Sequence, residues 1–234
     1  MLTKNIKIQA FRAIHDNKKC EQFYNGHINV LKSYGIDPIS SAQNAWFYNP
    51  EVYAIIAFEN DTCIGGVKLH KTGGTQALPL EDSIGFMDER IYDIVDKYSK
   101  SGAAEACGLW NSRDFSGLGL SNIMMIAVVA TAHQLNIKTL FGITSDHTEP
   151  LFRSFGYRVI RSIGSNGNFS YPTPKYLSRV IKMNSKTLSS ANPYNRRNIL
   201  SLRQNPKQKM IISNSKVKIN VEFDITLSMA TSSI

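Results

Sequence analysis

The chain has 234 residues and a formal net charge of +9 at pH 7, with 42% hydrophobic and 10% aromatic residues. This apolar content exceeds that of disordered chains and is enough for a hydrophobic core. The positive charge is confined to one end: residues 175–234 hold 11 basic and 2 acidic residues, so residues 1–174 are neutral overall. This distribution argues against a uniformly basic nucleic-acid binder.

The length of the apolar stretches and the spacing of the cysteines indicate the compartment of the protein and whether it binds a metal. The longest uncharged apolar stretch, residues 118–132, is too short and too interrupted to span a bilayer, and the N-terminus lacks the apolar segment of a signal peptide. Cys20, Cys63 and Cys107 are scattered without metal-ligand spacing. We therefore expect a cytoplasmic protein with reduced cysteines, no membrane span and no metal.

Apolar periodicity and turn residues predict the elements along most of the chain. In chain order we expect a strand at 7–14, a helix at 18–34 capped by Asp16, a loop at 38–50, strands at 52–58 and 62–70, a turn-rich segment at 71–85, a helix at 88–98 begun by Asp88, a strand at 103–110, a helix at 118–135, a strand at 138–144, a helix at 148–155 and a strand at 158–163. The strands at 52–58 and 62–70 flank a tight turn and predict a hairpin.

The last quarter of the chain has a different character. Residues 184–209 are rich in Ser, Asn, Lys and Arg, and we expect an extended basic arm there. Apolar and polar residues then alternate from Val217 to Leu227, which predicts a terminal β-hairpin with one solvated face. We expect two parts, residues 1–183 as the main domain and 184–234 as an arm and hairpin packed on it.

The order strand, long helix, strand over residues 103–144 is a βαβ unit, which requires a parallel strand pair. Together with the hairpin, it predicts an α+β (mixed α/β) fold with a central twisted mixed sheet and helices on both faces.

The segment between the strand and the long helix is the candidate for chemistry. Gly117 and Gly119 remove Cβ atoms where an anion could approach main-chain N–H groups at a helix N-terminus. On its own this pair is a weak signal, since an ordinary strand-to-helix turn explains it equally well. It is neither a Walker loop nor a complete Gly-x-Gly-x-x-Gly motif.

The element order, the glycine loop and the later pair Gly156-Tyr157 together resemble the GCN5-related N-acyltransferase (GNAT) superfamily over roughly residues 5–183. The family loop runs Gln/Arg-x-x-Gly-x-Gly/Ala. Here the position of its basic residue holds Asp114, and Arg113 lies one residue early. The resemblance implies an N-acyltransferase that moves an acyl group from a pantetheine thioester to an amine.

The resemblance also implies where the cofactor binds. The pyrophosphate would lie on the loop, and the pantetheine arm would add beside the strand before it, in a cleft where residues 106–111 splay from 138–144. The cofactor-binding residues so implied are Cys107, Leu109, Trp110, Asn111, Phe115, Ser116, Gly117, Leu118, Gly119 and Leu120.

Two side chains are candidates for catalysis. Glu105 is the only carboxylate on its strand, inside an apolar run, so it is either a base or amine-recognition group or a salt-bridged structural residue, with Arg12 as a possible partner. The family's usual acid, a Tyr, is replaced here by Phe152, which has no proton to donate. Tyr157 is the candidate substitute, although packing in the core explains it better than catalysis does. The alternatives are Tyr171 and a thiolate that leaves unaided or through water.

Glu105, the missing basic residue and Phe152 resemble one branch of the superfamily, the acyl-homoserine-lactone and long-chain N-acyl amino acid synthases. That likeness implies acyl-CoA or an acyl-phosphopantetheine on a carrier protein as donor, and a small-molecule amine or amino acid as acceptor. An acidic acyl carrier protein would suit the basic C-terminal segment. The alternative is a non-catalytic GNAT-like protein whose arm, with Arg196 and Arg197, contacts nucleic acid, although the arm has few aromatic residues.

Overall fold

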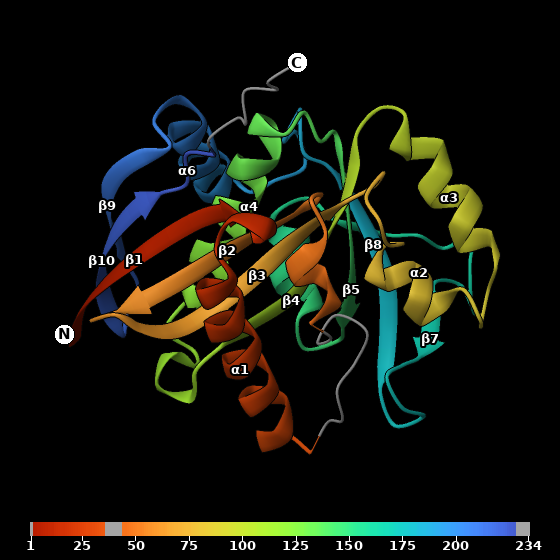
Figure 1. Cartoon of the computed structure of the whole chain (residues 1–234), viewed down its shortest axis with the longest axis horizontal. Helices are drawn as coiled ribbons and strands as arrows, with labels where there is room; N and C mark the ends of the chain where they lie inside the picture. The colour runs from red at the N-terminus through yellow and green to blue at the C-terminus, as the bar shows by residue number, and fades with distance from the viewer. Residues whose placement is uncertain (1, 36–43, 228–234) are drawn as a thin grey trace.

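The computed structural model describes residues 2–35 and 44–227, in which one twisted mixed sheet carries helices on both faces (Figure 1). The strands are β1 (Leu2–Arg12), β2 (Val52–Glu59), β3 (Thr62–Lys71), β4 (Ala103–Asn111), β5 (Thr139–Ser145), β6 (Arg158–Val159), β7 (Asn168–Ser170), β8 (Leu177–Asn184), β9 (Lys207–Ser213) and β10 (Val217–Asp224). The helices are α1 (Asn17–Ser33), α2 (Pro79–Ile84), α3 (Arg90–Ser99), α4 (Leu120–Gln134), α5 (Glu149–Ser154) and α6 (Pro193–Gln204), with short 3-10 turns η1 (Ala13–His15), η3 (Ala45–Tyr48) and η4 (Arg113–Phe115).

The strand order is β6-β8-β5-β4-β3-β2-β1-β10-β9, with β7 paired to β8. Neighbouring strands are antiparallel except for two parallel pairs, β4–β5 and β1–β10. The predicted hairpin, the predicted βαβ unit and the α+β class are therefore confirmed. The β2–β3 turn uses Asn60 and Asp61 at φ values of 47° and 64°, the left-handed pair that a two-residue hairpin needs.

Successive side chains of a strand point to opposite faces of the sheet, and both faces here carry buried apolar residues. Helices therefore cover both faces. Helix α4 is apolar all round and lies beneath the sheet centre, as such a helix must, and α6 packs beside it through Ile199 and Leu202. Helices α1 and α3 cover the opposite face (Figure 1). There α1 contributes Phe23 to a cluster with Trp46 and Trp110, and α3 contributes Ile91 and Val95 to a second cluster. Asp16 caps α1 as predicted, since its carboxylate accepts the Lys19 N–H at 3.0 Å.

Several predicted elements differ from the structure. The turn-rich segment 71–85 contains helix α2, whose six residues are too short for a periodic signal. The strand expected at 158–163 is only two residues long, and α3 begins at Arg90, two residues after Asp88. Strand β8 was not predicted, because Arg179 and Lys182 interrupt its apolar pattern. The expected loop 38–50 lies partly outside the described residues, and its last part is η3.

The extended arm expected at 184–209 is wrong, because residues 193–204 form α6. Asn192 caps this helix, its side chain accepting the Asn195 N–H at 2.7 Å. Ile199 and Leu202 face the core with Asn195, whereas Tyr194 and Leu200 are exposed on the solvent side among the polar residues. The terminal hairpin is confirmed as β9–β10, and the alternating Val217, Ile219, Val221 and Phe223 are all buried in the cluster that contains α4.

Candidate functional site

The centre of the sheet opens where β4 and β5 part. Their pairing covers Ala103, Ala104 and Glu105 of β4 and ends at Glu105–Phe141. Beyond that point, Gly108 adopts a φ of +61° and the β3–β4 register shifts between Gly66 and Lys68. This bulge turns β4 away from β5. The predicted splay is therefore present, and it leaves the β5-facing main chain of residues 106–111 outside the β4–β5 ladder.

A cleft of about 240 Å³ lies at this opening, called here the β4–β5 cleft. Both strands line it, and side chains from α1, α2 and the segment before β8 close its ends. Its lining residues are His27, Leu31, Pro79, Ser83, Glu105, Ala106, Cys107, Gly108, Leu109, Ile143, Thr144, Ser145, Thr148, Phe152, Tyr171, Pro172 and Ser178.

Glu105 is the carboxylate of this cleft, and its side chain is 2% exposed. Its Oε2 accepts the Leu80 N–H at the start of α2, at 2.7 Å. Burial raises the Glu105 pKa to about 8, against the opposing effects of that hydrogen bond and of Lys68. A carboxyl group with such a pKa takes up and releases protons near neutrality, as a general base must.

Lys68 is a buried cation beside Glu105 and was missed at the sequence level. It is 1% exposed, lies opposite Cys107 in the β3–β4 ladder, and its Nζ stands 4.7 Å from the Trp46 ring centroid. Burial lowers the Lys68 pKa. A lysine inside a β-rich run was the only signal, because buried lysines are rare. The cation beside Glu105 is therefore Lys68 and not Arg12, the partner considered from the sequence, because Arg12 pairs with Glu51.

His27 and Cys107 also line the cleft, and burial keeps both of them neutral. Burial lowers the His27 pKa to about 3 and raises the Cys107 pKa to about 12. A thiol that resists ionisation is a poor nucleophile. Cys107 is therefore a buried wall residue of the cleft, and a direct transfer to the amine fits this cleft better than a thioester on Cys107.

The two tyrosine candidates lie in different surroundings. Tyr157 is 2% exposed and stacks edge-on against Phe152, and its hydroxyl has no hydrogen-bond partner among the described residues. Burial raises its pKa well above the usual range. Tyr157 is not among the residues that line the β4–β5 cleft, whereas Tyr171 is, and the Tyr171 hydroxyl accepts a hydrogen bond from Ser83 at 2.9 Å.

The glycine loop connects the end of β4 to α4. Gly117 and Gly119 adopt φ values of +70° and +93°, which glycine reaches without strain, and Gly119 is the N-cap of α4. The Ser121 hydroxyl donates to Asn111 Oδ1 at 2.8 Å and so fixes the first turn of α4 to the strand. Ser116, Gly117 and Gly119 are exposed, so their main chain is accessible to an anion.

The tip of the C-terminal hairpin lies against this loop. Asn214 Nδ2 donates to the Leu118 carbonyl at 3.1 Å. A Cβ added to Gly117 would stand 3.8 Å from the Lys216 ammonium, and apart from its chain neighbours no other atom of the described residues lies within 4 Å of it. Lys216 is exposed and comes from a distant part of the chain, so no motif at the loop itself could reveal it.

The other residues that the resemblance implies for cofactor binding lie partly at the β4–β5 cleft and partly at the glycine loop. Leu109 lines the cleft, and Phe115 and Leu120 are buried beneath the glycine loop. The Trp110 side chain points to the face of the sheet that α1 covers, where its indole packs against Gly26 of α1. A Cβ on Gly26 would stand 2.1 Å from the indole. Trp110 can thus reach a cofactor only through its main chain.

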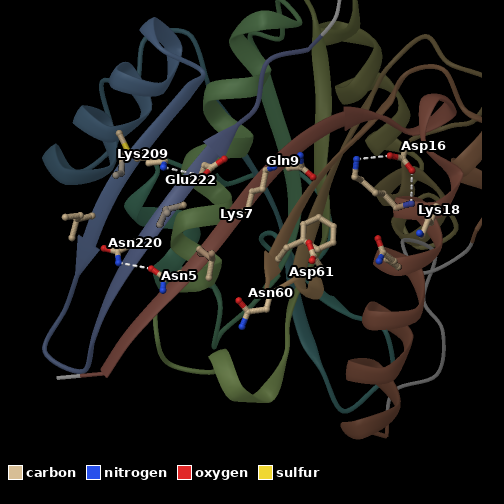
Figure 2. A pocket seen from close by; sticks show the side chains of 17 residues that line it. Asn5, Lys7, Gln9, Asp16, Lys18, Asn60, Asp61, Lys209, Asn220 and Glu222 are labelled. Carbon is tan, nitrogen blue, oxygen red and sulfur yellow. Dashed lines mark hydrogen bonds and ion pairs between the residues drawn. The ribbon is translucent and has the colours of Figure 1, made fainter.

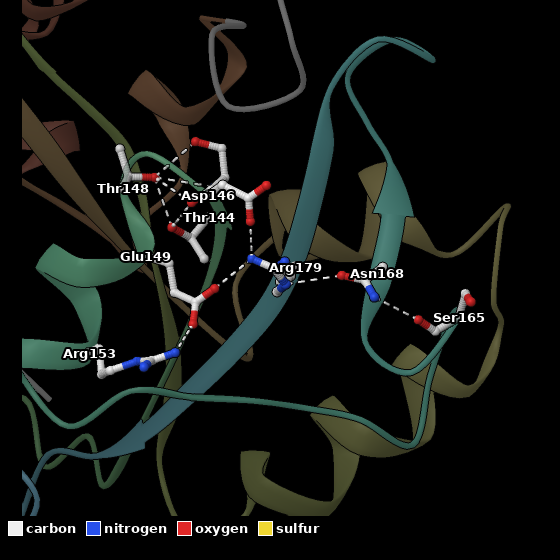
Figure 3. Close-up of polar contacts among 9 residues, drawn as sticks. Thr144, Asp146, Thr148, Glu149, Arg153, Ser165, Asn168 and Arg179 are labelled. Carbon is white, nitrogen blue, oxygen red and sulfur yellow. Dashed lines mark hydrogen bonds and ion pairs between the residues drawn. The ribbon is translucent and has the colours of Figure 1, made fainter.

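The β5 wall of the cleft is fixed by an ionic network (Figure 3). Arg179 on β8 pairs with Asp146 and, at 2.5 Å, with Glu149, and its Nε donates to Asn168 at 3.0 Å. Thr144 and Thr148 hydrogen-bond to each other at 2.8 Å at the cleft's edge. The network holds the N-terminus of α5 on β8 and thereby keeps the β5 end of the cleft in place.

A larger groove, of about 950 Å³, runs along the polar face of β1 and β10 beside α1 (Figure 2). Two of its lysines face carboxylates, since Lys19 pairs with Asp16 at 2.8 Å and Lys209 lies 3.9 Å from Glu222. It brings together no buried ionisable group comparable to Glu105. We therefore assign the chemistry to the β4–β5 cleft despite its smaller volume.

Within residues 2–35 and 44–227, no cluster of His, Cys, Asp and Glu has the arrangement of a metal site. In the same part of the chain, no helix combines the length and apolarity needed to cross a bilayer.

Comparisons with known proteins show the fold. No family model and no curated protein sequence matches the chain. Among solved structures, it resembles FeeM, an N-acyl amino acid synthase from uncultured soil microbes, with a TM-score of 0.61 and 13% identity over 82% of this chain and 97% of FeeM. It also resembles the CoA-dependent acyl-homoserine lactone synthase MesI, with a TM-score of 0.55 and 11% identity over 90% of this chain and 98% of MesI.

The acyl-homoserine-lactone synthase LasI gives a TM-score of 0.57 and 13% identity, over 78% of this chain and 91% of LasI. At these identities the likeness establishes architecture and leaves substrates open. The chain thus has the GNAT fold, and its neighbours include the synthase branch that the sequence resembles.

Proposed function

We propose that the protein is an N-acyltransferase that moves an acyl group from a pantetheine thioester to the amine of a small molecule. The observation that carries this proposal is the position of Glu105, a buried carboxyl with a pKa raised to about 8, at the point where β4 leaves β5. The activities of the similar synthases support the same reaction class.

The residues present fit a pantetheine cofactor. A pantetheine arm pairs with main chain as a strand does, and residues 106–111 of β4 offer a strand edge that β5 has left. The exposed Gly117 and Gly119 give a phosphate room at the N-terminus of α4. Lys216 supplies, from the hairpin, the cation that the family loop carries at its start and that Asp114 does not provide.

Three protein groups would serve the transfer. Glu105 as a carboxylate takes the proton of the incoming ammonium, and main-chain N–H groups near the β4 bulge donate to the oxygen that gains charge. The thiolate leaves with a proton from an acid. For that last role the hydroxyl of Tyr171, which lines the cleft, is better placed than that of Tyr157, which is buried beside Phe152.

Donor binding tests the proposal without knowledge of the acceptor. Calorimetry with CoA, a set of acyl-CoA thioesters and acyl carrier protein should give saturable binding to at least one of them. A Gly117→Val variant, whose side chain fills the approach to the loop, should weaken that binding at least about tenfold. If wild type binds no pantetheine thioester in any form, the proposal is wrong.

The carrier-protein donor depends on free positive charge, and the structure reduces the charge available. Arg179 is neutralised by its ion pairs with Asp146 and Glu149, whereas Lys182 and Arg203 bond neutral oxygen atoms and keep their charge, although both are partly buried. Exposed cations remain on α6 and the hairpin. The same residues would serve the alternative non-catalytic function, so a nucleic-acid panel belongs in the same experiment.

A further inference from the structure

A pocket of about 420 Å³ lies at the β6 edge of the sheet, and we call it the arginine pocket. Residues of α5, β6 and β8 line it, and Phe152 is the one residue that it shares with the lining of the β4–β5 cleft. Three arginines and one carboxylate line it together with four residues that have apolar or aromatic side chains. These lining residues are Glu149, Phe152, Arg153, Tyr157, Arg158, Val159, Arg161 and Ile181.

The arginine pocket carries more positive charge than its carboxylate balances. Glu149 accepts from both Arg153 and Arg179, so its charge is already shared (Figure 3). Arg158 and Arg161 are exposed, and no ion pair joins either of them to a carboxylate among the described residues. The sequence explains the excess, because no Asp or Glu occurs between Glu149 and Glu222.

The strand pair beside the pocket adds to this excess. Arg158 of β6 lies opposite Lys182 of β8 in the antiparallel ladder. The Lys182 amine donates to the Tyr98 hydroxyl at 2.6 Å, so it keeps its charge. Like charges directly opposite each other destabilise a strand pair, and an anion beside Arg158 would relieve this repulsion.

Tyr157 provides an independent reason to expect a ligand. It is 2% exposed, and its hydroxyl has no hydrogen-bond partner among the described residues. A buried hydroxyl without a partner loses its hydration and gains nothing in return. Because Tyr157 lines the arginine pocket and not the β4–β5 cleft, a ligand oxygen in this pocket can supply the missing partner.

We propose that the arginine pocket binds a phosphate monoester that carries an apolar group. The phosphate lies between Arg158 and Arg161, and the apolar group packs against Phe152, Val159 and Ile181. A guanidinium group binds phosphate through two parallel hydrogen bonds, and two unpaired guanidinium groups match the nearly two negative charges of a phosphate monoester.

Other anions fit this pocket less well. A carboxylate carries a single charge and would leave one of the two arginines without a partner. Inorganic phosphate would leave the apolar walls in contact with water. The site is also separate from the glycine loop, since none of its lining residues belongs to residues 115–120, and it does not depend on the proposed function.

The test is a titration of the isotope-labelled protein with four probes, followed by the NMR signals of its main-chain amides. Phenyl phosphate has both parts of the proposed ligand, whereas inorganic phosphate lacks the ring, benzoate carries one charge, and benzyl alcohol carries none. Phenyl phosphate should bind saturably, at least about fivefold more tightly than each of the other three. Its binding should shift the amide signals of residues 157–161.

Substitutions at the exposed arginines locate the phosphate. Arg158→Met and Arg161→Met should each weaken phenyl phosphate at least about fivefold, and Arg161→Lys should weaken it less, because it keeps the charge and loses the fork. Arg196→Met is the matched control, an exposed arginine on α6 outside the pocket, and should bind as wild type does. Lys216→Ala should also bind phenyl phosphate as wild type does, because Lys216 lies beside the glycine loop.

Several results would overturn the inference. They are the absence of saturable binding of phenyl phosphate, equal affinity for inorganic phosphate or benzoate, and unchanged affinity in Arg158→Met and Arg161→Met. Loss of binding in Lys216→Ala, with amide shifts at residues 116–120, would place the phosphate on the glycine loop. That outcome would also overturn the inference, and it would leave the proposed function standing.

Discussion

Asn214, at the tip of the C-terminal hairpin, donates a hydrogen bond of 3.1 Å to the Leu118 carbonyl, 96 residues earlier in the chain. This bond ties the hairpin to the glycine loop and brings Lys216 beside Gly117. Because β10 pairs with β1 along eight residue pairs, the hairpin is held by the sheet, and the position of Lys216 is set by the fold.

Lys216→Ala should weaken CoA binding about three- to tenfold, because one exposed ammonium–phosphate contact contributes about 1 kcal/mol. The loss should shrink as salt is raised, since salt screens this contact. Lys209→Ala is the matched control, a similarly exposed lysine on the same hairpin whose nearest acid is Glu222. Calorimetry at two ionic strengths measures both variants, and equal affinities would exclude Lys216 from the phosphate site.

Glu105 predicts the pH dependence of the reaction. Its pKa is raised to about 8, so the fraction of carboxylate grows as pH rises from about 6 and levels off above 8. A base works as the carboxylate, so kcat should rise over this range and reach a plateau. Glu105→Gln should lose at least about 100-fold in kcat and show no inflection near 8. An unchanged inflection in that variant would assign the titration to another group.

The effect of Glu105 on stability has the opposite pH dependence: kcat rises with pH, whereas the stability that Glu105 contributes falls. A carboxyl whose pKa is higher in the folded state than in the unfolded state binds its proton more tightly when folded. The stability it contributes is complete below the unfolded value of 4.5 and is lost as pH rises through about 8. Wild type should therefore lose Tm relative to Glu105→Gln between these pH values, which scanning calorimetry of both proteins checks.

Tyr171 and Tyr157 make different predictions as acids. Tyr171→Phe removes a hydroxyl from the cleft and should lower kcat by about tenfold or more if that hydroxyl protonates the thiolate. Tyr157→Phe removes a buried hydroxyl without a partner among the described residues and should leave kcat within about twofold and Tm unchanged or raised. The reverse order in single-turnover rates would restore Tyr157 as the acid.

We expect Arg179 to contribute to the stability of the fold and to take no part in the reaction. Arg179→Ala breaks its ion pairs to Asp146 and Glu149 and its bond to Asn168, so α5 loses its attachment to β8. We expect a loss of about 1–2 kcal/mol of stability, discounted because Arg179 is partly exposed. Arg153→Ala, which also loses a contact to Glu149 but leaves β8 untouched, should cost less in urea denaturation.

The fold was predictable from the sequence where a single helix or strand shows a clear hydrophobic periodicity of its own. The β2–β3 hairpin, the helix after Asp16 and the parallel β4–β5 pair all follow from local patterns. Helix α6 did not, because Ile199 and Leu202 are too few to show a helical stripe among polar residues, and only their contact with α4 explains them. Strand β8 was hidden in the same way, since Arg179 and Lys182 satisfy their charges in tertiary contacts.

The site was predictable along the strand and loop that carry it and no further. Glu105 was noticed because it is charged within an apolar run, and Gly117 and Gly119 because they are adjacent to a helix start. Lys68 and Lys216 reach the site from β3 and from the hairpin, so no motif on the strand or loop indicates them. Tyr171, from the segment before β8, was predicted only as an alternative to Tyr157. Tyr157, predicted as the substitute acid, has its hydroxyl buried outside the lining of the cleft.

The most direct test of the account is the release of free thiol from a pantetheine thioester, measured with a thiol reagent in the presence and absence of amines. We predict release that requires an amine acceptor, yields the N-acyl product by mass, and falls at least about 100-fold in Glu105→Gln. No amine-dependent release from any acyl-CoA or acyl carrier protein, with the protein folded and the amino acids saturating, would contradict it.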